Sequence, residues 1–191
     1  QVQTIDANQD GYIEEAFKLP CALREFTVPK PGADDLDDGP AIVGFGENIF
    51  SGAIGSLGAF AGASEKVFGG LAQSTMAETL DSRYHYGHPD MMDKLAMISQ
   101  GGISKATRTL NLSEDLFCGM DCMLRGREIS YREYYRVGKG RDMGFAAILS
   151  FFCKLSSGTA QMATSRQAYR LGTRLGFGRL LGFYYGHAGF Y

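Results

Sequence analysis

Residues 5–15 read IDANQDGYIEE, and this stretch decides the fold because two different structures are compatible with it. The first is the EF-hand, a calcium-binding loop with the pattern D-x-[DN]-x-[DN]-G and a glutamate at its twelfth position. Counted from Asp6, such a loop would cover residues 6–17, and its opening positions fit the pattern. The twelfth position, however, is Phe17, which has no oxygen to bind an ion. The loop therefore lacks its bidentate ligand.

The second structure is a strand that runs into an acidic turn and then a helix. Residues 1–5 alternate polar and apolar side chains, which is typical of a strand, whereas an EF-hand is entered from a helix. After Asp10 the apolar residues recur at nearly helical spacing, with Pro20 as an interruption. In α/β enzymes, acidic and amide side chains at the end of a strand often hold a metal or a sugar nucleotide. We therefore predict an α/β fold, and a calcium-binding regulatory module at residues 6–17 is the alternative hypothesis.

The composition indicates one folded domain of ordinary size. The chain has 191 residues, 45% of them hydrophobic, and a formal net charge of -2. This nearly neutral charge gives no indication of a nucleic-acid partner. The sequence shows no signal-peptide pattern and no run of about eighteen apolar residues that would span a membrane. Because Gln1 begins inside a strand-like pattern, we expect the chain to be a segment of a longer protein.

The four cysteines, Cys21, Cys118, Cys122 and Cys153, form no C-x-x-C pair. Their apolar surroundings predict reduced and buried thiols. Cys118 and Cys122 lie four residues apart on a predicted helix, a spacing that a metal site could use but that core packing explains better. The sequence therefore assigns no zinc site.

Polar connections separate the stretches that have strand or helix patterns. Residues 27–41 combine Pro, Gly and Asp and predict an acidic surface loop within the domain. Residues 42–52 begin as a strand that contains Glu47, and residues 53–76 predict a helix or loop of small side chains. The C-terminal part predicts amphipathic helices, which could lie at a membrane surface or pack on neighbouring elements. Their cations are Lys154, Arg166, Arg170, Arg174 and Arg179.

An acid pair follows a serine in residues 111–116, which read NLSEDL. Ser113 could cap a helix, and acids are favourable in the first turn of a helix. Helix capping would therefore be a sufficient explanation of Glu114 and Asp115 if the two acids stood alone.

Glycine-rich segments with cations flank this acid pair on both sides. Residues 138–142, GKGRD, place Lys139 and Arg141 beside two glycines, a composition suited to binding a diphosphate. Residues 101–105, GGISK, add a second flexible turn that ends in Lys105. This arrangement predicts sugar transfer from a nucleotide sugar, in which the cations bind the departing diphosphate and a carboxylate accepts the proton of the acceptor.

A histidine pair occurs in residues 83–90, which read RYHYGHPD. His85 and His88 lie three residues apart with Asp90 nearby, but a glycine and a proline make this segment a turn rather than a helix. We therefore predict a structural or substrate-contacting loop instead of a metal site.

Long stretches of the sequence resemble the catalytic region of 1,3-β-glucan synthases, the family of the fungal cell-wall enzyme and of plant callose synthase. The similarity runs nearly from end to end, and the order of the motifs agrees. The stretches are IDANQDGYIEEAFK, VGFGENIFSGAIGSLGAF, RYHYGHPD, GGISKATRTLNLSEDLF, MLRGREISYREYYRVGKGRDMGF and SRQAYRLGTRLGFGRLLGFYYGHAGF.

The resemblance implies a fold, an activity and a location. Residues 1–191 would form the later half of a GT-A-like glycosyltransferase domain, on the cytoplasmic side of a multispanning plasma-membrane protein. The implied reaction is inverting transfer of glucose from UDP-glucose to a growing β-1,3-glucan chain, which passes into a membrane channel. Flanking membrane helices outside this chain would anchor the domain. The resemblance leaves regulatory subunits open.

By analogy with cellulose synthases, the resemblance also assigns roles to residues. Ser113-Glu114-Asp115 takes the place of a Thr-Glu-Asp motif that supplies the general base, which makes Asp115 the candidate base beside Glu114. Asp6-Ala7-Asn8 takes the place of a donor-binding DxD motif, and Asn8 in place of an acid leaves the metal unknown. A divalent cation bound with UDP-glucose is the only cofactor left open. The predicted donor-binding residues are Asp6, Asn8, Lys105, Lys139, Arg141 and Asp142.

We expect these residues to converge on one cleft. One motif departs from the family pattern, because relatives have Gly-Glu-Gln before the SR-x-x-Y-x-LG stretch and this chain has Thr159-Ala160-Gln161. No role of that glutamate is therefore carried over to this chain.

Overall fold

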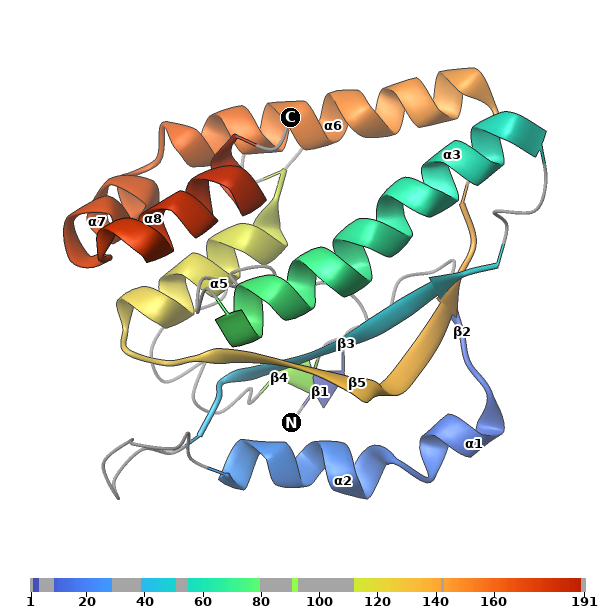
Figure 1. The fold of residues 1–191 in the computed structure, drawn as a ribbon, viewed down its shortest axis with the longest axis horizontal. Helices are drawn as coiled ribbons and strands as arrows, with labels where there is room; N and C mark the ends of the chain where they lie inside the picture. The colour runs from blue at the N-terminus through green and yellow to red at the C-terminus, as the bar shows by residue number, and fades with distance from the viewer. Residues whose placement is uncertain are drawn as a thin grey trace.

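The computed structural model describes residues 2–3, 9–28, 39–50, 55–79, 91–92, 112–141 and 143–189. In these residues the chain forms a mixed α/β domain, in which a small sheet has helices on both faces (Figure 1). This arrangement confirms the predicted α/β class. The predicted loop at 83–90 and most of the predicted acidic loop at 27–41 lie outside the described residues.

Two long parallel strands form the centre of the sheet. β3 (Ile42–Ile49) and β5 (Ile129–Lys139) pair along the whole length of β3. The register shifts after Phe45. Phe45 lies beside Arg132, but the next residue of β3, Gly46, lies beside Arg136. β5 therefore bulges between Arg132 and Arg136, and the residues of this bulge have no partner on β3.

Three two-residue strands complete the sheet, whose order is β1-β4-β3-β5-β2. They are β1 (Val2–Gln3), β4 (Met91–Met92) and β2 (Gln9–Asp10), and their pairings are antiparallel. β1 confirms a strand before Asp6. The predicted order of strand, turn and helix omitted one element. A second short strand, β2, lies between β1 and the first helix and pairs with β5. Backbone hydrogen bonding thus draws the end of the acidic stretch into the sheet.

The described part of residues 6–17 does not have the arrangement of an EF-hand loop. Asp10 belongs to β2, and its Oδ1 accepts a hydrogen bond from the N–H of Gly11 at 2.8 Å. A helix, α1 (Ile13–Ala16), already begins within the stretch, and the side chain of Phe17 is 79% exposed. Across the residues placed by the structure, no three His, Cys, Asp or Glu side chains are grouped to hold a metal ion. Asp6 and Asn8 lie outside them.

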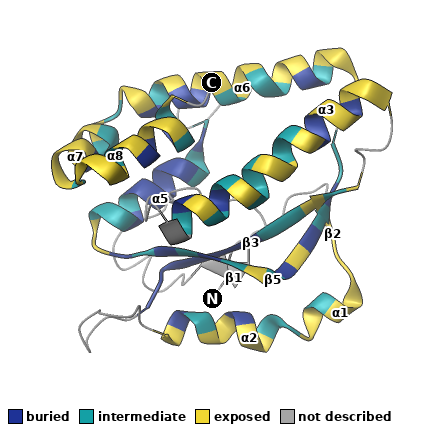
Figure 2. Ribbon diagram, viewed as in Figure 1, coloured by how far each residue is buried: buried dark blue, intermediate teal, exposed yellow. Residues whose placement is uncertain are grey.

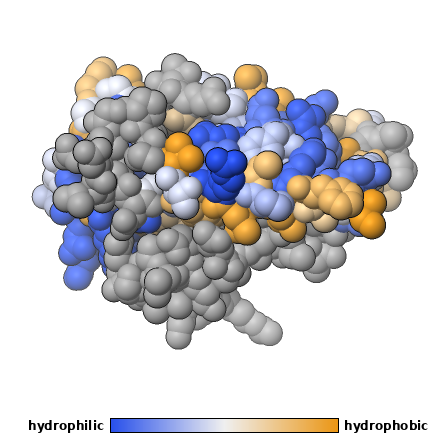
Figure 3. Space-filling model, turned by 90° about the horizontal axis from the view of Figure 1, so that it is seen from below, coloured by the Kyte–Doolittle hydropathy of each residue, from blue (hydrophilic) through white to orange (hydrophobic). Residues whose placement is uncertain are grey.

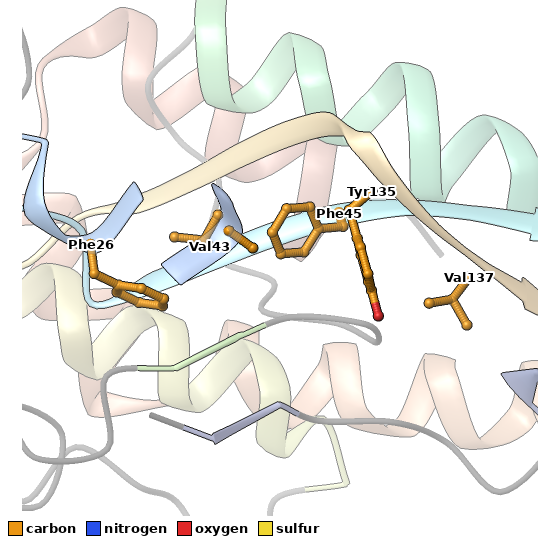
Figure 4. Close-up of a cluster of buried hydrophobic side chains, with 6 residues drawn as sticks. Phe26, Val43, Phe45, Tyr135 and Val137 are labelled. Atoms are coloured by element: carbon orange, nitrogen blue, oxygen red, sulfur yellow. The ribbon is translucent and has the colours of Figure 1, made fainter. Parts of the chain in front are cut away.

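One face of the sheet is covered by α1, by α2 (Leu19–Arg24) and by the 3₁₀ helix η1 (Glu25–Thr27) (Figure 1). The helical pattern is interrupted near Pro20, as predicted, because α1 ends at Ala16 and α2 begins at Leu19. Pro20 lies in the first turn of α2, where its missing N–H is not needed. Phe26 packs against an apolar row of β3 and β5. Figure 4 shows this row, which is Val43, Phe45, Tyr135 and Val137.

Side chains of the α1–α2 segment bind backbone groups of the β5 bulge. Lys18 Nζ donates to the carbonyl of Tyr134 at 2.8 Å, and the N–H of Arg136 donates to Glu15 Oε2 at 2.9 Å. Tyr134 lies within the bulge and Arg136 at its end, and polar backbone groups lose free energy if they are buried without partners. The bulge is therefore held in place by the helices on this face.

The opposite face is crossed by α3 (Gly55–Lys66), which continues as two short π-helices, η3 (Val67–Ala72) and η4 (Thr75–Thr79) (Figure 1). This segment confirms the predicted helix of small residues. Small residues let α3 approach its neighbours closely, and Gly58, Ala61 and Gly62 are its buried positions.

The helix α5 (Glu114–Leu124) is the most buried helix of the described chain (Figure 2). Cys118 and Cys122 pack with Ile42 and Ile129 against the sheet. Its other side packs on the C-terminal helices through residues such as Met120 and Met162. α5 therefore connects the sheet to the C-terminal part of the domain.

The C-terminal part confirms the predicted helices. They are α6 (Phe145–Ala163), α7 (Arg166–Arg174), α8 (Phe177–Phe183) and the π-helix η5 (Tyr184–Ala188). The five predicted cations, from Lys154 to Arg179, are all exposed. Within the described ranges, we find no helix whose length and apolar character would let it cross a membrane.

Several hydrophobic side chains are exposed on the surface. On the face that α1 and α2 cover, hydrophobic and hydrophilic patches lie side by side (Figure 3). Tyr12 and Ile13 of this segment are 75% and 76% exposed. The prediction of four buried thiols was right for Cys118 and Cys122 only, because Cys21 and Cys153 lie on solvent-facing sides of their helices and are exposed.

Candidate functional site

The structure describes four of the eight predicted site residues. Lys139 and Arg141 lie at and just beyond the end of β5, and Glu114 and Asp115 begin α5. Asp6, Asn8, Lys105 and Asp142 lie outside the described residues. The question that the structure can answer is therefore how the two cations and the two acids are placed.

Lys139 is the last residue of β5 and lies beside Ile49, the last residue of β3. The carboxyl ends of parallel strands meet at one edge of a sheet, where α/β proteins commonly bind their ligands. The Lys139 side chain is only 8% exposed, and its Nζ lies 3.7 Å from Glu47 Oε1 and 3.8 Å from Glu65 Oε1. The ammonium group is therefore held between one carboxylate of β3 and one of α3.

Arg141 is oriented by the same carboxylate from the other side. Its Nε and one Nη donate to the two carboxylate oxygens of Glu65, in the bidentate geometry that arginine favours. The guanidinium also lies 4.0 Å from the centre of the Phe151 ring, a cation–π contact with α6. Arg141 thus joins α3 to α6.

These four residues, Glu47, Glu65, Lys139 and Arg141, form what we call the charge cluster. Within the cluster, Lys139 and Arg141 of the GKGRD segment both contact Glu65. The structure also shows two carboxylates that neutralise them, so an incoming diphosphate would compete with Glu65 for both cations. Glu65 was missed in the sequence, although an acid inside a helix of small, buried residues predicts a cationic partner.

The acid pair begins α5 as expected, but not through the predicted cap. Ser113 occupies the N-cap position without a capping hydrogen bond from its side chain. Asp115 Oδ1 instead accepts the N–H of Leu116 at 2.9 Å. The two acids are partly exposed and lie in the first turn of α5, where negative side chains stabilise a helix.

Helix α6 links the two groups of residues. Near its C-terminus, Gln161 Oε1 accepts the N–H of Leu112 at 3.3 Å, and Gly158 faces Ser113. Near its N-terminus, Phe151 contacts Arg141. Phe151 and Gln161 are about 15 Å apart along the helix axis, at a rise of about 1.5 Å per residue. The convergence of Asp115 and Lys139 on one cleft stays a prediction.

Further along α5, the ionisable groups have perturbed pKa values because they are buried. Burial raises the pKa of the Asp121 carboxyl, although Arg125 and a hydrogen bond with Gln167 oppose this shift. Its hydrogen bond with Cys122, together with burial, raises the pKa of the Cys118 thiol. Cys118 is buried and Asp121 is partly buried near Arg125 and Gln167, and these surroundings explain the shifts without a catalytic role.

The comparisons with known proteins agree on one family. A family model described as "1,3-beta-glucan synthase component" matches residues 1–191. A 1,3-beta-glucan synthase component of Cordyceps militaris is 45% identical over 199 residues, and callose synthase 12 of Arabidopsis thaliana is 45% identical over 194 residues. The 1,3-beta-glucan synthase component FKS3 of Saccharomyces cerevisiae is 44% identical over 200 residues. The alignments include 100% of this chain but only 10–11% of each relative, so the chain spans about a tenth of their length.

Proposed function

Because the chain belongs to the 1,3-beta-glucan synthase component family, we propose that it forms part of the catalytic domain of a UDP-glucose-dependent 1,3-β-glucan synthase. The domain transfers glucose, with inversion at C1, to a growing β-1,3-glucan chain. The observation that carries this proposal is the family match over the whole chain, which includes both the acid pair and the GKGRD segment. The proposed fold of the complete domain is GT-A-like, and the mixed α/β architecture of this chain supports an α/β catalytic domain.

In the proposed reaction, Asp115 is the general base. The acceptor hydroxyl attacks C1 of glucose from the side opposite UDP, while the bond from C1 to the diphosphate oxygen breaks. The hydroxyl proton moves to the Asp115 carboxylate, and the negative charge leaves on UDP. Support comes from the position of Asp115, which is partly exposed at the start of α5 and is therefore accessible to an acceptor. Glu114 lies beside it in the same helical turn.

Lys139 and Arg141 are the proposed contacts of the departing diphosphate. Their charges are fixed in position by Glu47 and Glu65 before any ligand arrives, which lowers the entropic cost of ordering them on binding. The remaining donor-binding residues of the proposal are Asp6, Asn8, Lys105 and Asp142. A divalent cation at Asp6 and Asn8 stays an open part of the proposal, and no step above uses it.

The proposed location is the cytoplasmic side of the plasma membrane, where membrane helices of the longer protein would anchor the domain. The exposed cations of α6, α7 and α8 support this location, because anionic lipid surfaces attract basic amphipathic helices. The glucan product would pass into a membrane channel, and regulatory subunits would act on the assembled enzyme.

The experiment that tests this function is the Asp115→Asn variant in the full-length protein. Asparagine keeps the shape of the side chain but cannot accept the proton, so glucan synthesis from UDP-glucose should fall by about a hundredfold or more. UDP-glucose binding should persist. The matched control is Asp121→Asn, the same change on the same helix, whose turnover should stay within about twofold. Near-normal turnover of Asp115→Asn would reduce this acid to a helix-terminal residue.

Lys139→Ala should have a different effect. Loss of a cation that contacts the diphosphate in both the ground state and the transition state should weaken UDP-glucose binding by about 1.5 to 3 kcal/mol. Inhibition by UDP should weaken equally. The control is Lys154→Ala, which removes an exposed cation of α6. Unchanged UDP affinity in Lys139→Ala would remove this residue from the donor site.

A further inference from the structure

A hollow whose lining includes four charged side chains lies beside the charge cluster. It has a volume of about 280 Å³ and lies between η3, β3 and the bulge of β5. This volume is close to the lower limit of about 300 Å³ for small-molecule pockets, so it suits one ring-sized ligand. Glu47 lines this hollow and also contacts Lys139 at 3.7 Å, so the hollow adjoins the proposed diphosphate contacts.

Both elements that shape the hollow depart from regular geometry. η3 is a π-helix. This conformation is rare in proteins overall, but where it occurs it is often at a functional site. On the opposite side, the β5 bulge brings Glu133 and Arg136 to the lining, and bulges often redirect side chains next to active sites. The hydroxyl of Tyr131 donates to the carbonyl of Gly69 at 3.1 Å, which joins β5 directly to η3. The π-helix η3 and the bulged strand β5 thus meet at the hollow.

The charges of the lining discriminate between classes of ligand. Glu47 and Glu133 are opposed by Lys66 and Arg136, so the hollow has no net charge to attract a phosphate. A phosphate placed there would also face both carboxylates. A neutral molecule with several hydroxyl groups fits better, because each hydroxyl can donate to a carboxylate and accept from a cation or from the amide of Asn48.

The rest of the lining supplies an apolar surface. Val67 and Leu71 project from η3 into the lining and are 55% and 68% exposed. A sugar ring presents hydroxyls around its edge and C–H groups on its faces, so it complements both the polar and the apolar parts of this hollow. We propose that the hollow binds one glucosyl ring, with its C–H face against η3 and its hydroxyls on Glu47, Asn48 and the bulge.

This inference rests on the proposed function for the identity of the sugar. The ring has two sources, the glucose of UDP-glucose or a unit of the glucan chain. Both present the same chemistry, and the contact of Glu47 with Lys139 places either one next to the diphosphate contacts. The experiment therefore needs separate probes for the donor and for the glucan.

Gly70 offers a way to fill the hollow without disturbing the fold. It lines the hollow, and a Cβ built at this position meets no heavy atom within 4 Å. Gly70→Leu therefore extends a side chain into open space. Its matched control is Gly178→Leu, since Gly178 is exposed on α8 and also has nothing within 4 Å of a built Cβ. Gly70→Ala adds one methyl group and replaces glycine by a better helix former, so it serves if the leucine variant does not fold.

The measurement is steady-state glucan synthesis by the full-length protein, with UDP-glucose as donor, UDP as inhibitor and a β-1,3-linked glucotriose as acceptor. If the ring belongs to the donor, Gly70→Leu should raise the KM for UDP-glucose by about tenfold or more, with UDP inhibition changed less than about twofold. If it belongs to the glucan, the half-saturating glucotriose concentration should rise instead. Gly178→Leu should change neither.

Two other outcomes separate this inference from the proposed function. An active wild-type protein whose Gly70 variants keep normal constants for both donor and glucotriose would overturn the sugar site and leave the function standing. A wild-type protein that makes no glucan from UDP-glucose would overturn the function instead. Direct binding of glucotriose to the wild type and to Gly70→Leu would then decide the hollow, because only a sugar site there loses affinity in the variant.

Discussion

The charge cluster and the start of α5 are built in opposite ways. In the cluster, the carboxylates come from β3 and α3 and the cations from the end of β5, so each cation lies against a carboxylate that is distant in sequence. At the start of α5, the acids are neighbours in sequence, and Asp115 binds the N–H of the next residue. The first arrangement depends on the packing of α3 against the sheet and of α6 beside α3, whereas the second forms with a single helical turn.

The charged residues of the cluster are held by ion pairs inside the domain, whereas the acids of α5 are accessible to a ligand. Charges in the cluster are mostly buried and already neutralised, so changing one of them affects the stability of the domain as well as any ligand. The acids at α5 are partly exposed, so changing them should affect chemistry more than folding. The following variants test this contrast, beginning with the largest expected effect.

Glu65→Ala should be the most damaging change. It removes the carboxylate that binds Arg141 and contacts Lys139, so two largely buried cations each lose an ion pair, at a cost of about 3 to 5 kcal/mol. The midpoint of thermal unfolding of the full-length protein should fall accordingly. Glu14→Ala, which removes an exposed acid of α1, is the control and should have little effect. A Glu65→Ala protein as stable as the wild type would mean that the cluster does not hold α3 to α6.

Gly158→Ala tests the contact between α6 and the start of α5. A Cβ at this position would lie 2.1 Å from Ser113 Oγ and 3.2 Å from Ser113 Cβ, so the two helices must move apart. Overpacking of this kind costs about 1 to 3 kcal/mol, and displacement of Asp115 should also lower turnover.

The control for this variant is Gly172→Ala, where the nearest atom to a built Cβ is Leu180 Cδ1 at an ordinary 4.0 Å. Adding Ser113→Ala to Gly158→Ala removes the clashing hydroxyl and should restore part of the lost stability. If the double variant were no more stable than Gly158→Ala alone, the clash would not be the cause.

Asp121→Asn should have the smallest effect, and its sign depends on pH. Burial raises the pKa of Asp121 in the folded state above its ordinary value, despite the opposing effects of Arg125, Gln167 and Arg170. The folded protein then binds more protons than the unfolded chain between these two pKa values, so this group destabilises the fold as pH rises through that window.

The Asp121→Asn variant should therefore have a slightly higher unfolding midpoint than the wild type at neutral pH. The difference should shrink as pH falls below the ordinary pKa of aspartate, about 3.9, because the protonated carboxyl then resembles the amide. Thermal unfolding measured across this range checks the trend. A difference that is independent of pH would assign the effect to packing instead.

Local sequence patterns predicted the helices and strands better than they predicted which strands pair and which helix faces are covered. The strand-like start of residues 42–52 and the amphipathic pattern of the C-terminal part identified β3 and the C-terminal helices, because such patterns follow from backbone geometry alone. The pairing of Gln9 and Asp10 with β5 was not predicted, since a two-residue strand has no periodicity to detect. The exposure of Cys21 and Cys153 was likewise missed, because apolar neighbours in sequence do not decide which side of a helix is covered.

The sequence by itself determined the α/β class, the family, and the acid pair at the start of a helix, because all of these depend on residues that are close together in the chain. Only the tertiary structure decided that Lys139 and Arg141 share Glu65, and that a π-helix and a strand bulge line one hollow beside them. The physical reason is distance along the chain. Glu65 lies 76 positions before Arg141, and no local pattern records which buried carboxylate will neutralise a given cation until the helices pack on the sheet.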